Sequence, residues 1–377
     1  MRVLHVSPAF YPATRWGGPI QSTKAICDGV AARNDVQLRM LTTDAASPKW
    51  RDRLTPVPLP YPVRYAYRLA GHSIAPGLLA RLPQAIAWAD VVHLTATYSF
   101  PTLPTLLLAR LMGKPLVWSP RGALQATTDW VDAPNRWAKR AFANLAQMVR
   151  ADQVVLHATS EAEARQSVPH LRGVASTVIP NCVDLPQEVT PIIPKTGLRL
   201  LYLGRLHPKK GLDLLLDAMA ALPPTTTLDI YGTGDPAYMQ HLRDRAATDC
   251  GRIWLHGHVD GPQKAAAFAA ADLLVLPSHS ENFGIVVAEA LAHARPVLTT
   301  TGTPWARLAH RGCGACIDLR QTDLATAITD LSGMDLRDMG LKGREWMAAE
   351  FGPAQMVDAF YRLYRDLLSG AGRPVPA

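Results

Sequence analysis

The stretch Leu273 to Trp305, LLVLPSHSENFGIVVAEALAHARPVLTTTGTPW, decides the fold of this chain. Its apolar start, 273–276, predicts a buried strand, and the apolar residues spaced through 285–292 predict a helix. A second apolar run, Val297–Leu298, predicts the next strand. Strand, helix and strand in this order form a βαβ unit with a right-handed crossover in a parallel sheet. Ligands of such sheets bind beyond the carboxyl ends of the strands, which here means at Ser278–Phe283.

Two glutamates mark this place. Glu281 lies in the predicted loop and Glu289 lies on the predicted helix, roughly 12 Å further along if the whole span were helical. That separation is too large for one pair of carboxylates in acid–base catalysis, and it suits an elongated ligand held at two points. The free N–H groups of a helix N-terminus, here around Phe283–Ile285, form an anion site between them. The alternative is that Glu281 is a capping or solvated acid and that Glu289 is an exposed helix residue.

The two glutamates belong to a longer pattern, PSxxExFGxxxxEAL followed by a strand and TxxTPW. This pattern resembles family 4 of the retaining glycosyltransferases. The resemblance implies an α/β protein of the GT-B fold, in which two Rossmann-like domains with parallel sheets face each other across a cleft. It also implies that Glu289 binds the ribose hydroxyls of a nucleotide-sugar donor and that Glu281 acts in catalysis by holding the transferred sugar. The other donor-binding residues that it implies in this stretch are Asn282, Phe283, Gly284 and Ile285.

Length and composition agree with a two-domain globular protein. The chain has 377 residues, of which 48% are hydrophobic and 19% are charged. The apolar run at the N-terminus is too short for a signal peptide, and no run of about 18 uncharged apolar residues predicts a membrane span. Five scattered cysteines favour a reducing, cytoplasmic compartment. The pair Cys313 and Cys316 is half of a zinc site, a redox pair or a turn before a strand, and we favour the turn.

Positive charge is concentrated in the first half. Residues 1–185 carry 20 Lys and Arg against 11 Asp and Glu, whereas 186–377 carry 19 against 20. Such a basic half faces nucleic acid, an anionic membrane surface or an anionic acceptor. No aromatic-interleaved basic run or nucleic-acid motif accompanies the charge, so we expect no nucleic-acid partner.

A basic helix is predicted at 135–150. Its apolar side would carry Trp137, Ala141, Phe142, Leu145 and Met148. This side either contacts a membrane peripherally or packs on the core of the domain, and we favour the core.

In the first half, polar groups follow three predicted strands. Gly17 and Gly18, between the first strand and a helix, allow close approach of an anion or sugar, although a tight turn explains them as well. His93 ends a strand, where an isolated histidine is commonly buried and satisfied, and Arg121 follows another strand, where it meets an acceptor charge or a structural ion partner. The resemblance implies that the glycines approach the donor diphosphate, that His93 contacts the donor sugar as a catalytic residue, and that Tyr11 and Arg121 serve the acceptor.

In the second half, the strand at 198–203 delivers Gly204-Arg205 and then Lys210, where two cations are placed to neutralise a diphosphate. The resemblance implies that Arg205 and Lys210 bind the donor phosphates and stabilise the departing one. It places His258 and Val259, after a later strand, at the base of the nucleotide. The histidines of this loop leave a metal site as an alternative, and we favour exposed loop residues.

These patterns predict an N-terminal acceptor-side domain at 1–185, a linker at 186–197, a nucleotide-sugar-binding domain at 198–352 and a helix at 353–377 that crosses back to the first domain. No Asp-x-Asp occurs in the chain, so we expect a metal-independent hexosyltransferase with no cofactor beyond its co-substrate. By resemblance, it moves a sugar with retention from a UDP- or GDP-sugar to a hydroxyl of a glycan or a lipid-diphosphate-linked acceptor, with the leaving phosphate as base. Its place would be the cytoplasm or the inner face of the cytoplasmic membrane. The alternatives are a catalytically silent sugar-nucleotide-binding subunit, and an epimerase or phosphorylase on the same fold.

Overall fold

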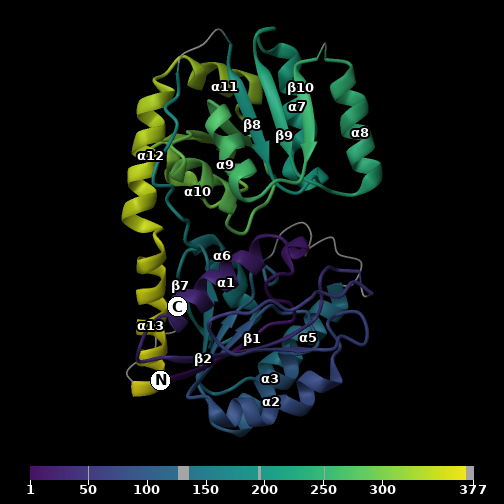
Figure 1. The fold of residues 1–377 in the computed structure, drawn as a ribbon, viewed down its shortest axis with the longest axis vertical. Helices are drawn as coiled ribbons and strands as arrows, with labels where there is room; N and C mark the ends of the chain where they lie inside the picture. The colour runs from purple at the N-terminus through teal and green to yellow at the C-terminus, as the bar shows by residue number, and fades with distance from the viewer. Residues whose placement is uncertain (50, 126–135, 194–196, 250, 371–377) are drawn as a thin grey trace. The chain divides into compact units, whose positions relative to one another are not determined.

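A computed structural model describes residues 1–49, 51–125, 136–193, 197–249 and 251–370 (Figure 1). The chain forms two compact units, Met1–Cys182 with Pro353–Ala377, and Val183–Gly352. Each unit is an α/β structure around one parallel sheet, as the sequence predicted. None of the helices in the described part of the chain is long and apolar enough to span a bilayer.

The sheet of the first unit has seven strands in the order β3-β2-β1-β4-β5-β6-β7. All its neighbouring strands are parallel, and His5 pairs with His93 where the first strand meets the fourth. The strand order reverses at this pair, so the loops that follow β1 and β4 diverge and leave room for a ligand. The strands are β1 (Arg2–Val6), β2 (Gln37–Thr43), β3 (Val63–Ala66), β4 (Val91–Thr95), β5 (Leu116–Ser119), β6 (Val154–Ala158) and β7 (Ala175–Val178).

The helices of the first unit include the last helix of the chain. They are α1 (Gly18–Ala31), α2 (Pro76–Trp88), α3 (Thr102–Leu111), α5 (Arg136–Val149), α6 (Glu161–Ser167) and α13 (Pro353–Ser369), with short 3-10 turns at Thr14–Trp16 and Val168–His170. α13 buries Met356, Phe360, Tyr364 and Leu367 in the same core as Val3, Ile26 and Val117. α1 and α13 touch closely at Gly29, where an added Cβ would lie 2.1 Å from Cγ2 of Val357. Ser160 caps α6, because its side chain accepts a hydrogen bond from the Glu163 N–H.

The sheet of the second unit has six parallel strands in the order β10-β9-β8-β11-β12-β13. Its strands are β8 (Arg199–Leu203), β9 (Thr227–Tyr231), β10 (Ile253–Gly257), β11 (Leu273–Leu276), β12 (Val297–Thr300) and β13 (Gly314–Ile317). Its helices are α7 (Leu212–Ala221), α8 (Pro236–Ala247), α9 (Gly261–Ala270), α10 (Ile285–Ala292), α11 (Leu324–Ser332) and α12 (Leu336–Glu350), with 3-10 turns at Pro208–Lys210 and Ala306–Leu308. The predicted βαβ unit is confirmed as β11, α10 and β12.

The domain bounds and the positions of Cys313 and Cys316 lie close to those expected from the sequence. The division into domains was expected after residue 185 and before residue 353, and the structure separates its units after Cys182 and after Gly352. Part of the expected linker, 194–196, lies outside the described residues. Cys313 is buried and unpaired just before β13, and Cys316 lies within this strand.

The apolar side of α5 is a correction to the sequence analysis. Trp137, Ala141, Leu145 and Met148 were expected to pack on the core, but all four are exposed. Phe142, the fifth residue of this side, does pack on the core as expected, together with Val149 and the small residues Ala143 and Ala146. Residue 135, the expected start of this helix, lies outside the described residues.

Candidate functional site

Two loops meet where the strand order of the second sheet reverses. β8 and β11 are neighbours there, with Leu200 paired to Leu273, and the loops 204–211 and 277–284 follow them at the same edge. Gly211 has a φ of +71°, and an added Cβ would lie 2.1 Å from the carbonyl oxygen of Pro277. The loops are also joined by a hydrogen bond of 2.9 Å from the His279 N–H to the Lys209 carbonyl. Only glycine fits this left-handed, crowded position, so Gly211 sets how closely the loops approach.

The contact between the loops brings a cation to a carboxylate. Lys210 Nζ forms an ion pair with Glu281 Oε1, to which Ser278 Oγ also donates at 3.1 Å. The side chains of Lys210 and Glu281 are only 13% and 12% exposed. Arg205 is exposed on the same loop as Lys210, and its guanidinium has no hydrogen-bond or ion-pair partner among the described residues. The site therefore holds one compensated and one available cation.

Glu289 lies on α10 with an unused oxygen. Lys264 of α9 binds Glu289 Oε1 at 2.5 Å. Oε2 is shielded from solvent and has no hydrogen-bond partner in the described structure. Burial raises the pKa of Glu289, and the Lys264 charge opposes this effect. A shielded carboxylate oxygen without a donor is costly, and this geometry suits a ligand hydroxyl that supplies the missing hydrogen bond.

The N-terminus of α10 lies between Glu281 and Glu289 in the chain. Gly284, with a φ of +71°, is its N-cap, and the helix begins at Ile285. Phe283 is buried against Trp305, whose Nε1 donates to the Phe283 carbonyl at 2.6 Å. The Phe283 side chain therefore belongs to the core, and Asn282 beside it is half-buried. The first N–H groups of the helix have no partner within it, so they present an anion site.

The His258 loop lies at the start of α9, the helix that carries Lys264. His258 is exposed, with Nε2 3.6 Å from a carboxylate oxygen of Asp260, and Val259 is half-buried. The structure agrees with the favoured interpretation, an exposed loop. Among the residues that the structure describes, no three His, Cys, Asp or Glu side chains form a group that would hold a metal ion.

In the first unit, Gly17 and Gly18 are exposed at the N-terminus of α1, and Gly17 has a φ of +85°. Tyr11 precedes them in the same loop. Its carbonyl accepts a hydrogen bond of 2.6 Å from the Tyr65 hydroxyl, and Lys24 Nζ lies 5.1 Å from the centre of its ring. The helix N-terminus offers backbone N–H groups to an anion, whereas Lys24, further along α1, is paired with Asp28.

His93 is a correction. It is fully buried, with Nδ1 2.6 Å from the Tyr364 hydroxyl and Nε2 2.7 Å from Ser119 Oγ. Ser119 Oγ also lies 2.7 Å from His157 Nδ1, and His157 Nε2 lies 2.9 Å from the Ile179 carbonyl. With both ring nitrogens occupied and no exposed surface, His93 does not contact a donor sugar in this structure, and the alternative of a satisfied buried histidine holds.

The hydrogen-bond partners determine which atom carries the proton on each side chain from Tyr364 to His157. The Ile179 carbonyl only accepts, so His157 carries its proton on Nε2 and accepts from Ser119 at Nδ1. Ser119 has one proton, so it accepts from His93 Nε2–H, and His93 Nδ1 accepts from Tyr364. Burial lowers the pKa of His157 to about 3, and that of His93 well below its usual value, so both rings are neutral at pH 7.

Arg121 follows β5 in a left-handed conformation with a φ of +54°. Its Nη1 donates to Asn181 Oδ1 at 2.9 Å, whereas Nε and Nη2 are shielded and have no partner in the described structure. The nearby Glu163 carboxylate accepts instead from the N–H groups of Gly122 and Thr159. Burial lowers the pKa of Arg121, and Glu163 opposes this effect. Among the residues that the structure describes, Arg121 forms no structural ion pair, and two of its guanidinium donors face no acceptor.

Comparison with known families covers both units. Residues 17–182 match the family described as glycosyl transferase 4-like domain, and residues 197–333 match glycosyl transferases group 1. The chain belongs to the group 1 glycosyltransferases of the family 4-like type. The resemblance inferred from the glutamate pattern is therefore confirmed.

Individual glycosyltransferases agree with this assignment. Glycogen synthase of Mycobacterium tuberculosis is 32% identical over 291 residues, which are 71% of this chain and 65% of that enzyme, so the match spans less than two thirds of the relative. The lipopolysaccharide glucosyltransferase WaaG of Escherichia coli is 31% identical over 147 residues, 38% of each chain. The structure of Anabaena HepE in complex with UDP superimposes with a TM-score of 0.73 at 18% identity, over 97% of this chain and 100% of that chain. The predicted GT-B fold class is confirmed.

The sequence analysis missed three residues of this candidate site. Lys264 binds Glu289, Ser278 binds Glu281, and Trp305 holds the Phe283 carbonyl. Lys264 is the only cation of α9, and nothing in its sequence neighbourhood indicated contact with a different helix. Ser278 and Trp305 stood inside the quoted stretch, but their partners depend on how the loops fold back.

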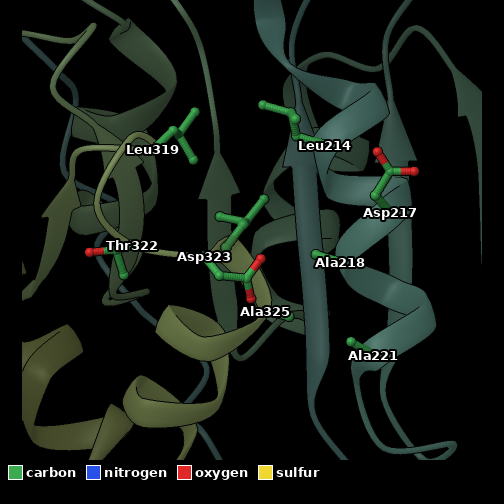
Figure 2. Close-up of a pocket in the computed structure, with 9 residues that line it drawn as sticks. Leu214, Asp217, Ala218, Ala221, Leu319, Thr322, Asp323 and Ala325 are labelled. Carbon is green, nitrogen blue, oxygen red and sulfur yellow. The ribbon is translucent and has the colours of Figure 1, made fainter.

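A separate cavity of about 290 Å³ lies between α7 and the start of α11 (Figure 2). Its lining includes Leu214 and Asp217 from α7, and Leu319, Thr322 and Asp323 from the chain that leads into α11. Asp217 is bound by Arg245, and Asp323 caps α11. None of the predicted site residues lines this cavity.

Proposed function

We propose that this protein is a metal-independent, retaining glycosyltransferase that moves a hexose from a nucleotide diphosphate sugar to a hydroxyl of a glycan or lipid-diphosphate-linked acceptor. The observation that carries the proposal is the placement of Arg205, Lys210 and Glu281 on two loops at one sheet edge, followed by the helix α10, which carries the unsatisfied carboxylate oxygen of Glu289. Each part of a nucleotide sugar would meet a group of suitable charge. Glu289 would accept from the ribose hydroxyls, Arg205 and Lys210 would donate to the phosphates, and Glu281 would accept from the sugar hydroxyls.

The donor would lie along these groups. The ribose hydroxyls would donate to Glu289 Oε2, and the base would lie near His258 and Val259. The diphosphate would accept from the N-terminus of α10 at Gly284 and Ile285 and from the two cations. Helix N-termini and cations both stabilise phosphate, and they do so most strongly when they are already oriented.

Binding would rearrange the ion pair of the free protein. Lys210 is compensated by Glu281 in this structure. A diphosphate would offer Lys210 a second anion, and Glu281 would then accept from hydroxyls of the sugar. After this exchange Lys210 would be paired with phosphate and Glu281 would be hydrogen-bonded to hydroxyls. Neither shielded charge would be left isolated, which would be costly.

The transfer itself needs no enzyme nucleophile in this proposal. The bond between the anomeric carbon and the phosphate oxygen breaks, and the bond from the acceptor oxygen forms on the same face. The acceptor proton passes to the leaving phosphate, whose growing charge is stabilised by Arg205 and Lys210. Removing one such preorganised donor typically costs about 2.7–4 kcal/mol in the barrier.

The acceptor would be bound by the first unit. The shielded Nε and Nη2 of Arg121 suit an anionic group, and Tyr11 with Gly17 and Gly18 presents backbone and aromatic surface. His93 would act as a positioning residue, since it contacts only protein groups. The lipopolysaccharide substrate in the printed name of WaaG, and the UDP bound to HepE, support a UDP-sugar and an envelope glycan, with work at the inner face of the cytoplasmic membrane.

The first test is calorimetry of UDP, GDP and ADP against the purified chain in EDTA. We expect one nucleotide to bind without metal, and Arg205→Ala to weaken that binding. Glu281→Ala should then abolish turnover with the matching sugar nucleotide while nucleotide affinity is largely kept. Binding without turnover in the wild type, across acceptor mixtures, would favour a silent sugar-nucleotide-binding subunit. No binding of any nucleotide would refute the donor assignment.

A further inference from the structure

The strongest unexplained feature outside the candidate site is a small cavity of the second unit, near the amino ends of its strands. The cavity has a volume of about 60 Å³ and is lined by residues 189–192, Ala294, Arg295, Arg337 and Leu341. This volume holds one small anion or a few water molecules, and it is too small for a sugar or a nucleotide. Two arginines line the cavity, and no acid lines it among the described residues.

Arg295 is the buried cation of this cavity. The residue is only 1% exposed. Its Nε donates to the Phe268 carbonyl at 2.7 Å, and its Nη2 donates to the Thr190 carbonyl at 2.5 Å. Nη1 is shielded from solvent and has no hydrogen-bond partner in the part of the chain that the structure describes. A shielded donor without an acceptor is costly, so Nη1 is the atom of this side chain that lacks a ligand.

The charge of Arg295 is not neutralised by a carboxylate. Its hydrogen bonds to described residues all go to backbone carbonyls. Asp272 is already held by Arg199 through two side-chain hydrogen bonds of 2.9 and 2.5 Å. Burial lowers the pKa of Arg295 to about 10, and Asp272 opposes this effect, so the guanidinium stays charged at pH 7. A buried charge without a counter-ion lowers stability, and a bound anion would remove this cost.

Arg337 supplies a second cation from α12. It is exposed, and its guanidinium has no hydrogen-bond or ion-pair partner among the described residues. The acids closest to it in the sequence are engaged elsewhere, since Asp335 caps α12 and Asp338 is paired with Lys342. One shielded and one accessible guanidinium therefore line the same cavity. Guanidinium groups are well suited to tetrahedral oxyanions, because they present several N–H donors in one plane.

We propose that this cavity binds inorganic phosphate through Arg295 and Arg337. Nη1 of Arg295 would donate to one phosphate oxygen and Arg337 would donate to the others, while residues 189–192 and Leu341 limit the size of the ligand. None of these residues belongs to the proposed donor or acceptor site. The inference therefore does not depend on the proposed function.

A bound phosphate would link two segments that already lie together. The segment that begins at Val183 donates its first N–H to the Phe351 carbonyl, just after α12, at 2.9 Å. Arg344 of α12 donates to the Pro186 carbonyl at 2.5 Å. Phosphate between residues 189–192 and Arg337 would add a third link between this segment and α12. We therefore expect the segment to exchange its amide hydrogens more slowly when phosphate is present.

Thermal unfolding of the full chain in EDTA, with phosphate titrated at constant ionic strength, tests the proposal. The melting temperature should rise with phosphate, and the dissociation constant should be about 1 mM, because two charge-assisted contacts suffice for that affinity. Arg337→Ala should raise this constant at least about tenfold, and Arg337→Lys should recover part of the loss. Hydrogen exchange at the Thr190 and Ile192 amides should slow on addition of phosphate in the wild type and not in Arg337→Ala.

Two controls separate this cavity from other cationic groups. Arg243→Ala is the matched control, because Arg243 is exposed on α8 and does not line the cavity. Arg205→Ala, and wild type saturated with UDP, remove phosphate binding at the proposed donor site. All three should leave the dissociation constant of phosphate within about twofold of wild type. Arg295→Met should abolish the response to phosphate, and Arg337→Ala decides the matter if that variant does not fold.

Three results would overturn the proposal. They are a melting temperature that does not respond to phosphate at constant ionic strength, a wild-type response in Arg337→Ala, and a response that UDP or Arg205→Ala removes. The last result would show that phosphate occupies the donor site instead. A chain that binds no nucleotide would count against the proposed function alone, because the phosphate titration of Arg337→Ala does not use nucleotide.

Discussion

Glu289→Gln is expected to move donor affinity and stability in different directions. Lys264 is a donor without an accepting atom, so it orients the new amide with the carbonyl oxygen toward itself. The amide nitrogen then occupies the place of the free Oε2 and presents a donor to the ribose, where the wild type presents a charged acceptor. A hydrogen bond to a charged group contributes about 1.5–3 kcal/mol. The dissociation constant of the nucleotide should therefore rise about 10- to 150-fold.

The free energy of unfolding of Glu289→Gln should rise or stay nearly unchanged. Burial raises the folded-state pKa of Glu289, so the folded protein binds this proton more tightly than the unfolded chain does. Above that pKa the charged carboxylate lowers stability by a constant amount, and this cost disappears as the pH falls through the folded-state pKa to the lower pKa of the unfolded chain. The glutamine removes this cost at pH 7. The loss of the partly exposed Lys264 pair opposes it by about 1 kcal/mol at most.

The assays are calorimetry with the nucleotide that the wild type binds and thermal unfolding in the same buffer. Glu350→Gln is the matched control, because Glu350 binds Arg307 and Arg311 away from the two loops. It should keep the wild-type affinity. An unchanged dissociation constant for folded Glu289→Gln would refute the ribose assignment. An equal loss in Glu350→Gln would show that removing any paired glutamate of this unit disturbs the site.

Three further predictions address the loops and the first core. Lys210→Ala should lower turnover about 100- to 1,000-fold, measured as product formation at saturating donor, and a Lys209→Ala control with the same loss would contradict the specific role of Lys210. Gly211→Ala should lower the melting temperature more than Gly251→Ala, since both positions have positive φ but only Gly211 meets a backbone oxygen; equal shifts would show that the loop contact is not tight. Burial lowers the pKa of His5 and of His157 from 6.5 to about 3, so each should reduce the free energy of unfolding by about 1.4 kcal/mol per pH unit below about pH 6; a urea midpoint that stays constant from pH 7 to 5 would contradict this.

The secondary structure of the second unit could be predicted because its signals are local. β11 is identified by an apolar run that ends at a proline, and α10 by a glycine at its start. Neither signal depends on distant residues. The proximity of Lys210 to Glu281 followed from a general rule, since loops at the reversal point of a parallel sheet share one edge. The partner of Glu289 could not be predicted in this way. Lys264 reaches Glu289 from a helix 25 positions earlier, and only the packing of α9 on the sheet brings them together.

The two errors of the sequence analysis have related physical causes. The family resemblance assigned His93 to the donor sugar, but the last helix of the chain covers it and supplies Tyr364 as its partner. The apolar stripe of α5 was assigned to the core because such stripes usually point inward. Periodicity shows that a helix has two faces, but which face packs depends on the space beneath it. Here Phe142, Ala146 and Val149 pack on the core, whereas Trp137, Leu145 and Met148 stay exposed.

The Tyr364 contact has a consequence for the order in which the chain gains structure. The hydroxyl that satisfies His93 and the aromatic ring of Phe360 that completes the same core come from residues beyond 352, whereas everything else in that unit lies before 183. During synthesis the ribosome must therefore finish the whole second unit before the first core can close. A nascent chain stalled near residue 352 would hold a complete second sheet and a first sheet with an open apolar wall, a state that chaperones recognise. The first unit is the first to be synthesised and the last to complete its core.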